Sequence, residues 1–585
     1  MEAPIVLLDD ASPGGGGRLL RFARPSRIIA AQKPEDVPAA LAALETALAE
    51  GRHLAGWVAY ELGYALSPTL APLQWAERSG PLLWFGVFDA PERIQRDTLS
   101  AAARAYAGPL RHEWDERAYA TRFARVHDYI GAGDIYQANL SFRSRFAFAG
   151  DPFALYLGLR DRAQAPHSAF INTGGLQILS LSPELFFEIS PEGAIVVRPM
   201  KGTAARGTDA VSDRLARANL AESVKDRAEN LMIVDLMRND VGRVAQLGSV
   251  VVKDLFSVET YPTLHTMVST VKAALKPGTP LTAVIEALFP CGSVTGAPKI
   301  RAMEIIRELE QSPRGVYCGA IGHFAPDGSA RFNVAIRTLT IRGAEGELGI
   351  GGAIVHDSVR EAEYAECLLK ARYYEVARKA LRLIETLRFA PAEGFGRLER
   401  HLHRMAVSAS ALGISFDRAR AVAALEREAS GANGPLRVRM TLDETGSFET
   451  TSAPLAAGKP QWRFTLSPVR MDSRDTLLRH KTDWRDVFEH EFETVAAAGL
   501  DEIVFLNKRE EVTEGSRTNL FAKLDGELVT PPVSAGLLPG CLRQEMLDEG
   551  ICKEKTLRRD DLVRARALFL GNSLRGLVPA ILVQS

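Results

Sequence analysis

Lys201 is the first residue whose type and setting could do chemistry. It lies in the stretch PMKGT (199–203), directly before a glycine, where the backbone can come close to a ligand. A lysine amine becomes a useful nucleophile when its pKa is lowered by burial or by a nearby positive charge such as a metal ion. Most lysines are merely solvated, so other motifs must decide between a nucleophile and a surface residue.

Glu229 could hold a metal ion. The sequence from Glu222 to Val244 predicts a helix, on which Glu229, Met232, Ile233 and Leu236 follow the spacing i, i+3, i+4 and i+7. A carboxylate on an apolar face is costly to bury unless it is paired or bound to a metal. A metal ligand and an internal salt bridge to an arginine both remain open.

Two further carboxylates recur on a second predicted helix. After Asp357-Ser358, which suit a helix N-cap, Glu363, Glu366 and Lys370 share one face. Oxygen ligands presented in this way suit Mg²⁺, which binds few protein carboxylates and fills its other positions with water and substrate. Taken alone, a surface ion pair between Glu366 and Lys370 explains the pattern better.

An arginine follows a predicted strand at Arg331 to Ile336. Alternation places Phe332, Val334 and Ile336 on one face, so Arg337 is expected on the other. From there its guanidinium could bind a carboxylate with two parallel hydrogen bonds.

The elements that carry these residues require more than one folded unit, because 585 residues exceed a single hydrophobic core. Alternating strand and helix patterns run to about Tyr374, as in one large α/β or α+β unit. A second unit begins near Leu383, with a helix predicted around residues 398–412 that ends at Gly413. The connector at 453–460 divides this second unit.

Composition excludes several classes of function. A hydrophobic content of 46% and the absence of a long apolar run argue against a membrane protein, and a net charge of -1 argues against a nucleic-acid partner. The N-terminus lacks the pattern of a secretory signal. The cysteines are odd in number and scattered, which supports neither a disulfide framework nor a zinc site; they are Cys291, Cys318, Cys367, Cys541 and Cys552. We therefore expect a cytoplasmic protein.

A series of motifs runs along most of residues 50–375. They are GDIYQANLS (133–141), SPELF (182–186), PMKGT (199–203), AENLMIVDLMRND (228–240), GSVTGAPK (292–299), YCGAIGHF (317–324), VAIRT (334–338) and DSVREAEYAE (357–366). In sequence and in order, this series resembles the motifs of the chorismate-utilising enzymes. The resemblance implies two mixed sheets packed as a sandwich, with helices outside.

The resemblance also implies roles for individual residues. Glu229 and Glu366 would hold Mg²⁺, with Glu363 as an additional or outer ligand. The substrate would be bound by side chains and backbone amides at Tyr317, Arg337, Gly202, Thr203, Gly351 and Gly352. The family more often has a third glycine where this chain has Ala353.

Three positions bear on which chorismate reaction is expected. Lys201 resembles the aminodeoxychorismate synthases, since anthranilate synthases have alanine there. In that family the amine attacks the ring as the 4-hydroxyl leaves, and ammonia then displaces it at C4. Thr266 stands where anthranilate synthases place a histidine, although His265 is adjacent. Gln137 stands where isochorismate and salicylate synthases use a lysine to activate water.

The second unit carries a second series of motifs. They are RLERHLHRM (397–405), LRHKTDWR (478–485), VTEGSRTNLF (512–521), LLPGCLR (537–543) and GNSLRG (571–576). This series resembles the motifs of fold-type IV pyridoxal phosphate enzymes, among which the aminodeoxychorismate lyases match best. The fold implied consists of two α/β subdomains, and the family's architecture leaves room for a homodimer through this unit.

By this resemblance Lys481 would attach pyridoxal phosphate and remove the C4 proton of the substrate, while Glu514 would keep the pyridine nitrogen protonated. Arg404, the amides near Cys541 and Leu542, and Ser573 would bind the phosphate. Thr386 resembles an active-site threonine of the lyases. These lysines and arginines could instead be solvated surface residues without a role in binding or catalysis, as most lysines and arginines are.

Together the motifs predict a chorismate-binding domain at 1–375 and a lyase-like domain at 380–585, the latter with a small part (380–455) and a large part (460–585). The expected function is synthesis of p-aminobenzoate from chorismate. No GxCxG element of a glutamine amidotransferase occurs, so ammonia would come from a separate glutaminase subunit or from free ammonium. The alternatives are an anthranilate synthase, a fold-type IV aminotransferase in the second unit, or a second unit that serves as a non-catalytic scaffold because its small part is shortened.

Overall fold

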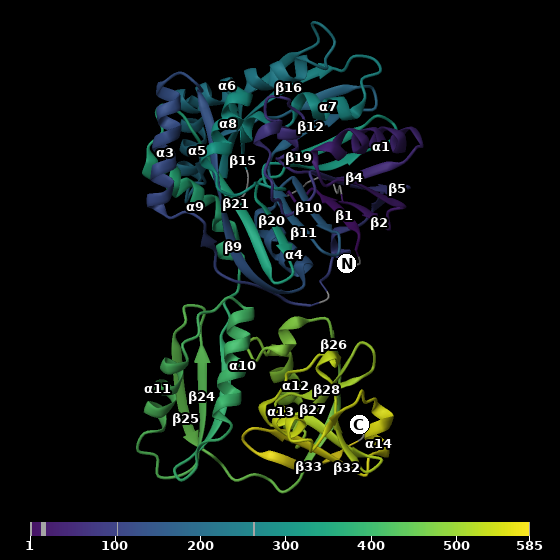
Figure 1. Ribbon diagram of the computed structural model, residues 1–585, viewed down its shortest axis with the longest axis vertical. Helices are drawn as coiled ribbons and strands as arrows, with labels where there is room; N and C mark the ends of the chain where they lie inside the picture. Colours follow the sequence, from purple (N-terminus) through teal and green to yellow (C-terminus); the bar gives the residue numbers. More distant parts are fainter. Residues whose placement is uncertain (1–2, 13–18, 102, 261–263, 584–585) are drawn as a thin grey trace. The chain divides into compact units, whose positions relative to one another are not determined.

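The computed structural model describes residues 3–12, 19–101, 103–260 and 264–583 (Figure 1). The chain forms two compact units. The first comprises Met1–Ser100, Leu110–Phe146 and Tyr156–Ala377, and the second comprises Ala101–Pro109, Ala147–Leu155 and Arg378–Ser585. The two short segments differ from the domain ranges predicted from sequence. They pair with each other through β7 (Ala105–Ala107) and the end of β9 (Gln137–Gly150), and Tyr106 is buried in a hydrophobic core of the second unit.

The first unit contains two large sheets among its described residues. One has the order β17-β9-β21-β20-β11-β10-β1-β2-β6, and β8 pairs with β9. Its remaining strands span Gly296–Ala297, Glu345–Ile354, Thr338–Arg342, Gln177–Ser182, His167–Asn172, Ile5–Asp9, Leu19–Ala23, Glu92–Arg93 and, for β8, Arg111–His112.

The other sheet has the order β14-β16-β13-β12-β19-β18-β4-β5-β3, with β15 paired to β16. In this order, with β15 last, its strands span Met200–Ala205, Leu264–Ala274, Ala194–Val197, Leu185–Ile189, Ala330–Val334, Ala320–Phe324, His53–Val58, Leu83–Phe88, Arg27–Ala31 and Val251–Thr260.

Apolar residues from both sheets form a shared core, as the predicted sandwich requires. Val6 and Ile178 of the first sheet lie in one buried cluster with Trp57, Trp84 and Ile321 of the second. The rings of Trp57 and Trp84 are stacked with centroids 4.9 Å apart. Each fully buried side chain of this size contributes about 2 kcal/mol or more through removal from water.

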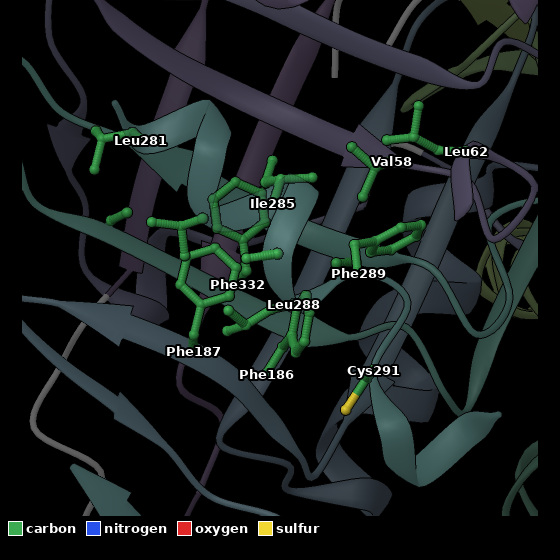
Figure 2. Packing of buried hydrophobic residues seen from close by; sticks show 14 of the residues in the cluster. Val58, Leu62, Phe186, Phe187, Leu281, Ile285, Leu288, Phe289, Cys291 and Phe332 are labelled. Atoms are coloured by element: carbon green, nitrogen blue, oxygen red, sulfur yellow. The ribbon is translucent and has the colours of Figure 1, made fainter. Parts of the chain in front are cut away.

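Helices cover the outer face of the second sheet (Figure 2). Phe187 of β12 and Phe332 of β19 stack with centroids 5.1 Å apart and lie beside Ile285 and Leu288 of α7 (Leu281–Leu288). Because this sheet is covered on both faces, β5 reads as a continuous apolar run, and all six of its residues are buried. The other helices of the first unit span Val37–Ala49 (α1), Leu62–Ala65 (α2), Glu116–Gly131 (α3), Ala210–Glu222 (α5), Val224–Gly242 (α6), Lys299–Leu309 (α8) and Arg360–Ala377 (α9). Helix α4 (Pro152–Ala163) begins in the segment that groups with the second unit and continues in the first.

The second unit consists of a small sheet with two helices and a larger mixed sheet. The small sheet has the order β23-β22-β24-β25 and the larger has β28-β27-β26-β33-β32-β29-β30-β31. In these orders the strands span Gly394–Phe395, Leu383–Ala390, Leu436–Leu442 and Phe448–Pro454, then Val512–Gly515, Glu502–Asn507, Trp462–Met471, Gly576–Leu582, Ala567–Asn572, Asn519–Leu524, Glu527–Thr530 and Lys553–Glu554.

Helix α10 (Leu398–Ala411) confirms the predicted helix of the second unit, and Gly413 follows it with φ +67° in the left-handed region expected of a C-terminal glycine. The other helices of this unit are Arg418–Ala429 (α11), Asp486–Ala497 (α12), Cys541–Asp548 (α13) and Arg559–Arg564 (α14). In the part of the chain that is described, no helix is long and apolar enough to cross a membrane. The five cysteines are buried, free thiols.

Candidate active sites

Lys201 lines a cavity of about 240 Å³ in the first unit. It lies on β14, where the pairing with β16 shifts register between Met200 and Thr203. Such a bulge re-aims a side chain locally. The next residue, Gly202, has φ +88°, and a Cβ there would come within 2.9 Å of Asp226 on α6. Gly202 therefore permits both the left-handed backbone and the close approach of α6.

The surroundings of Lys201 shift its pKa downward. Burial lowers its pKa, and Lys370 acts in the same direction, while Glu229 opposes the shift. A lowered pKa raises the fraction of neutral amine near pH 7. The structure thus gives Lys201 the electrostatic setting that a nucleophile needs.

Glu184, which follows β11 in the SPELF motif, shares this cavity but received no role from sequence reasoning. Burial raises its pKa to about 7, although Ser293 and Lys201 lower it in part. One of its carboxyl oxygens is buried without a hydrogen-bond partner among the described residues. A carboxyl group in this state can donate a proton near neutral pH. In the sequence, only its place in the SPELF motif (182–186) pointed to Glu184.

The three glutamates expected to hold Mg²⁺ all line the same cavity, Glu229 from α6 and the other two from α9. Glu229 lies 3.9 Å from Lys225 and Glu366 lies 2.9 Å from Lys370, while Ser358 donates a 2.7 Å hydrogen bond to Glu363. Helices α6 and α9 confirm the two helices that the sequence predicted to carry these glutamates. A set of carboxylate oxygens facing one cavity fits a hard divalent cation.

Most of the residues expected to bind substrate line the same cavity. Tyr317 is buried and lines the cavity with Arg337 and Gly351. The strand prediction was wrong in detail, because β19 ends at Val334 and Arg337 has φ 49°, so the alternation of a strand does not orient its side chain. Gly202 and Thr203 also line the cavity, whereas Gly352 is not among its lining residues.

Thr266 and its neighbour His265, which bear on the choice between chorismate reactions, both make local hydrogen bonds. Thr266 donates a 3.3 Å hydrogen bond to the carbonyl of Gly202, next to Lys201. His265 is buried and its ring nitrogens lie 3.0 Å from Asp213 and 2.9 Å from Thr260. Neither Thr266 nor His265 is among the cavity-lining residues. His265 therefore belongs to a hydrogen-bonded set beside the site.

Lys481 lines a second cavity, of about 490 Å³, within the second unit. It precedes α12, and its backbone carbonyl accepts a 2.8 Å hydrogen bond from the amide of Ile384 on β22. Burial lowers its pKa to about 8, helped by the charges of Arg485 and Arg404. This amine is therefore partly neutral near pH 7, as covalent attachment of an aldehyde requires.

Glu514, on β28, lines the same cavity. Burial raises its pKa to about 7, and one oxygen accepts a 3.0 Å hydrogen bond from the amide of Leu538. A buried carboxyl group needs a partner for its charge, and a protonated pyridine nitrogen would supply one. The position fits the role expected from the lyase resemblance.

Arg404 is held in place from the small sheet. Glu385 of β22 accepts hydrogen bonds of 2.9 and 2.6 Å from its guanidinium, and His401 lies 2.6 Å from the same carboxylate. Glu385, His401 and Cys541 have ligand atoms close enough to hold a metal ion. The cationic Arg404 already neutralises this carboxylate, so the chemistry of the group favours an anion next to Arg404 over a metal.

The start of α13 adds possible hydrogen-bond donors for an anion next to Arg404. The helix begins at Cys541 after Gly540, and no side chain caps its first amides. Uncapped amides at a helix N-terminus bind phosphate readily. Cys541, Leu542, Ser573 and Thr386 all line the cavity together with Arg404. Every residue proposed from sequence for pyridoxal phosphate is thus brought to one cavity, and these residues fit a phosphate, an aldehyde and a ring nitrogen.

Residues 6–374 match the family of chorismate binding enzymes, and the chain belongs to that family. Residues 382–583 match the class IV amino-transferase family. Both matches confirm the resemblances and the fold class inferred from the motifs.

Relatives with named activities resemble the first unit. Aminodeoxychorismate synthase component 1 of Salmonella typhimurium is 47% identical over 248 residues, which are 42% of this chain and 54% of that protein. Anthranilate synthase component 1 of Cereibacter sphaeroides is 41% identical over 268 residues, 46% of this chain and 53% of that protein. The chain therefore spans about half the length of these relatives.

A solved structure supports the fold of the first unit. The crystal structure of anthranilate synthase component I from Streptococcus pneumoniae TIGR4 matches with a TM-score of 0.53 and 24% identity, covering 64% of this chain and 92% of that one. At this level of identity the likeness concerns the fold.

Proposed function

We propose that this chain converts chorismate to p-aminobenzoate in two steps, amination in the first unit and elimination of pyruvate in the second. The observation that carries the proposal is the placement of a lysine with a lowered pKa in each of two cavities, each beside a buried carboxyl group whose pKa is near 7. Membership of the chorismate-binding family supplies the substrate class. The class IV match supplies a unit suited to consume the aminated product.

Chorismate carries two carboxylates, and the first cavity offers complementary donors. Arg337 and the hydroxyl of Tyr317 would bind one of them, because both line the cavity. The backbone around Gly351 would approach the ligand closely, since no side chain stands there. When bound by Glu229, Glu363 and Glu366, Mg²⁺ would stabilise negative charge on the substrate.

In the first step Lys201 would attack the ring as its neutral amine. The bond between C4 and the hydroxyl breaks, and Glu184 would donate the proton that turns the departing hydroxide into water. Ammonia then bonds to C4 while the bond to Lys201 breaks. Lysine at position 201 favours this reaction over the anthranilate synthase alternative. Ammonia would come from a separate glutamine amidotransferase, consistent with the "component 1" name of the relative, or from free ammonium.

In the second step the substrate amine would bind at the cofactor held by Arg404 and Glu514. Bound pyridoxal phosphate withdraws electrons from the carbon that carries the amine. Lys481 would remove the proton from C4, the bond between C3 and the ether oxygen breaks, and the ring becomes aromatic. The leaving enolpyruvate takes up a proton to give pyruvate. Thr386 lines the same cavity and could donate a hydrogen bond to the departing oxygen.

The first step is tested with the full-length Lys481→Ala variant, which isolates amination. Incubated with chorismate, Mg²⁺ and ammonium, it is expected to accumulate aminodeoxychorismate, and adding Lys201→Ala should lower the rate at least about 100-fold. The exposed Lys253→Ala on β15 is the matched control. Anthranilate as the main product would overturn the proposal for this unit.

The second step is tested by adding pyridoxal phosphate to the wild-type chain. Attachment to Lys481 should produce a visible absorption band that Lys481→Ala lacks. The wild type should also release pyruvate from supplied aminodeoxychorismate. If the wild type shows no band and forms no pyruvate, the second unit is a scaffold, and amination alone remains.

A further inference from the structure

The small sheet of the second unit presents one of its faces to the Lys481 cavity. Side chains alternate along β24, so Val438 and Met440 are buried in the core beneath the helices, while Arg437 and Arg439 lie on the other face. Both arginines line the cavity. Two arginines therefore lie side by side on this wall of the cavity. Neither has a role in cofactor binding or in the reaction proposed above.

These two arginines differ from the others that line the cavity. The other four are engaged: Arg404 with Glu385, Arg485 with the carbonyl of Ser516, Arg575 with the carbonyl of Ala456, and Arg517 over the ring of Phe492. Within the described part of the chain, the side chains of Arg437 and Arg439 have no hydrogen bond, ion pair or ring contact. Their guanidinium groups are thus available to a ligand in the cavity.

Strand register orders this wall relative to Lys481. The amide of Ile384 donates to the carbonyl of Lys481, which fixes the near end of β22. Two residues further along β22, Thr386 pairs with Arg439 of β24. Two residues beyond Thr386, Arg388 pairs with Arg437. Successive side chains on one face are about 7 Å apart. Arg439 is therefore the nearer cation to the Lys481 end of the wall, and Arg437 is the farther one.

The two carboxylates of the substrate in the proposed second step lie at different distances from its amine. Its amine, at C4, must lie at the cofactor. The enolpyruvyl group on the adjacent C3 carries one carboxylate, and the ring carboxylate on C1 lies across the ring, opposite the amine. With the amine at the cofactor, the nearer cation would face the group that leaves as pyruvate, and the farther one would face the group that the product keeps.

We propose that Arg439 binds the enolpyruvyl carboxylate and Arg437 binds the ring carboxylate, so that this pair selects a dicarboxylate ring amine. The assignment rests on the proposed lyase function. Guanidinium groups suit it because they bind carboxylates through two parallel hydrogen bonds. An ordinary amino acid carries no ring carboxylate, so the pair would also disfavour the aminotransferase alternative.

The two contacts can be separated with the product, because p-aminobenzoate retains only the ring carboxylate. Binding of p-aminobenzoate to the full chain loaded with pyridoxal phosphate is measured by calorimetry for wild type, Arg437→Met and Arg439→Met. Arg437→Met should weaken it at least about tenfold, and Arg439→Met less than about twofold. Both variants should raise KM for supplied aminodeoxychorismate. Arg420→Met, exposed on α11, is the control for loss of a positive charge.

Two results would overturn the assignment: product binding and KM unchanged in both variants, or weaker product binding in Arg439→Met but not in Arg437→Met. The absorption band of the lysine-bound cofactor, retained in both variants, shows that the site is folded. If the wild type binds p-aminobenzoate through Arg437 yet releases no pyruvate, the lyase proposal fails while the carboxylate site stands.

Discussion

At the scale of residues, the first cavity buries an amine and a carboxyl group so that burial shifts the pKa of each toward its uncharged form. Burial lowers the pKa of Lys201 and raises that of Glu184 to about 7. Their mutual attraction works against both shifts, so burial dominates. Both shifts favour the uncharged forms, a neutral amine and a protonated carboxyl group, and these are the forms that attack and departure of a hydroxyl require.

This arrangement predicts a bell-shaped pH dependence of amination. Activity should fall at low pH as Lys201 gains a proton, and fall above about pH 7 as Glu184 loses the proton that it donates. Glu184→Gln cannot donate in this way, so it should be slower and lack the decline on the alkaline side. Steady-state rates of aminodeoxychorismate formation between pH 5.5 and about 9 test this. An unchanged alkaline decline in Glu184→Gln would assign that limb to another group.

At the scale of elements, β22 and α10 together position Arg404 in the second unit. β22 supplies Glu385 to the core side of the small sheet, where the carboxylate holds Arg404, and supplies Thr386 to the cavity side. The charges of Arg404 and His401 outweigh burial and lower the pKa of Glu385 to about 2. The carboxylate therefore stays ionised, and the guanidinium has a fixed place before any phosphate binds.

Removing this anchor should weaken cofactor binding. Glu385→Ala leaves the buried cation of Arg404 without its partner, which is strongly destabilising in proteins. The affinity for pyridoxal phosphate, titrated through the absorption band of the lysine-bound form, is expected to fall at least about tenfold. Glu399→Ala removes an exposed carboxylate from α10, the helix that carries Arg404, and serves as control. Equal affinities in the two variants would mean that Arg404 does not need Glu385.

A pair of glycines on β21 allows a test of the wall of the first cavity. A Cβ at Gly351 would lie 2.5 Å from the carbonyl oxygen of Leu140 on β9, whereas one at Gly352 would meet nothing closer than 3.6 Å. Gly351→Ala must therefore push two paired strands apart, at a cost of about 2 kcal/mol. Calorimetry should show a lower Tm for the first unit in Gly351→Ala than in Gly352→Ala. The reverse order would contradict this close approach.

At the scale of the whole molecule, the sequence predicted both folded units and their families because ordered motifs carry that information. It also named residues that the structure brings to two cavities, Lys201 and Lys481 among them. It did not predict that residues 101–109 and 147–155 group with the second unit, because β7 is short and its pairing with the end of β9 depends on tertiary contacts. The roles of individual buried groups also required structure.

Glu184 and the arginine pair illustrate that limit. Glu184 lies in a motif, but burial raises its pKa, and burial cannot be read from motif letters. Arg437 and Arg439 alternate with apolar residues in RVRM (437–440), which is the ordinary pattern of a half-exposed strand. Only the cavity distinguishes them from solvated arginines.

The central claim is that one chain carries out both steps, and the most direct test is the stoichiometry of products. Wild-type protein loaded with pyridoxal phosphate is incubated with chorismate, Mg²⁺ and ammonium. We predict that p-aminobenzoate and pyruvate appear in equal amounts, matched to the chorismate consumed, and that Lys481→Ala accumulates aminodeoxychorismate instead. Anthranilate with pyruvate, or a wild type that stops at aminodeoxychorismate just as Lys481→Ala does, would contradict the account.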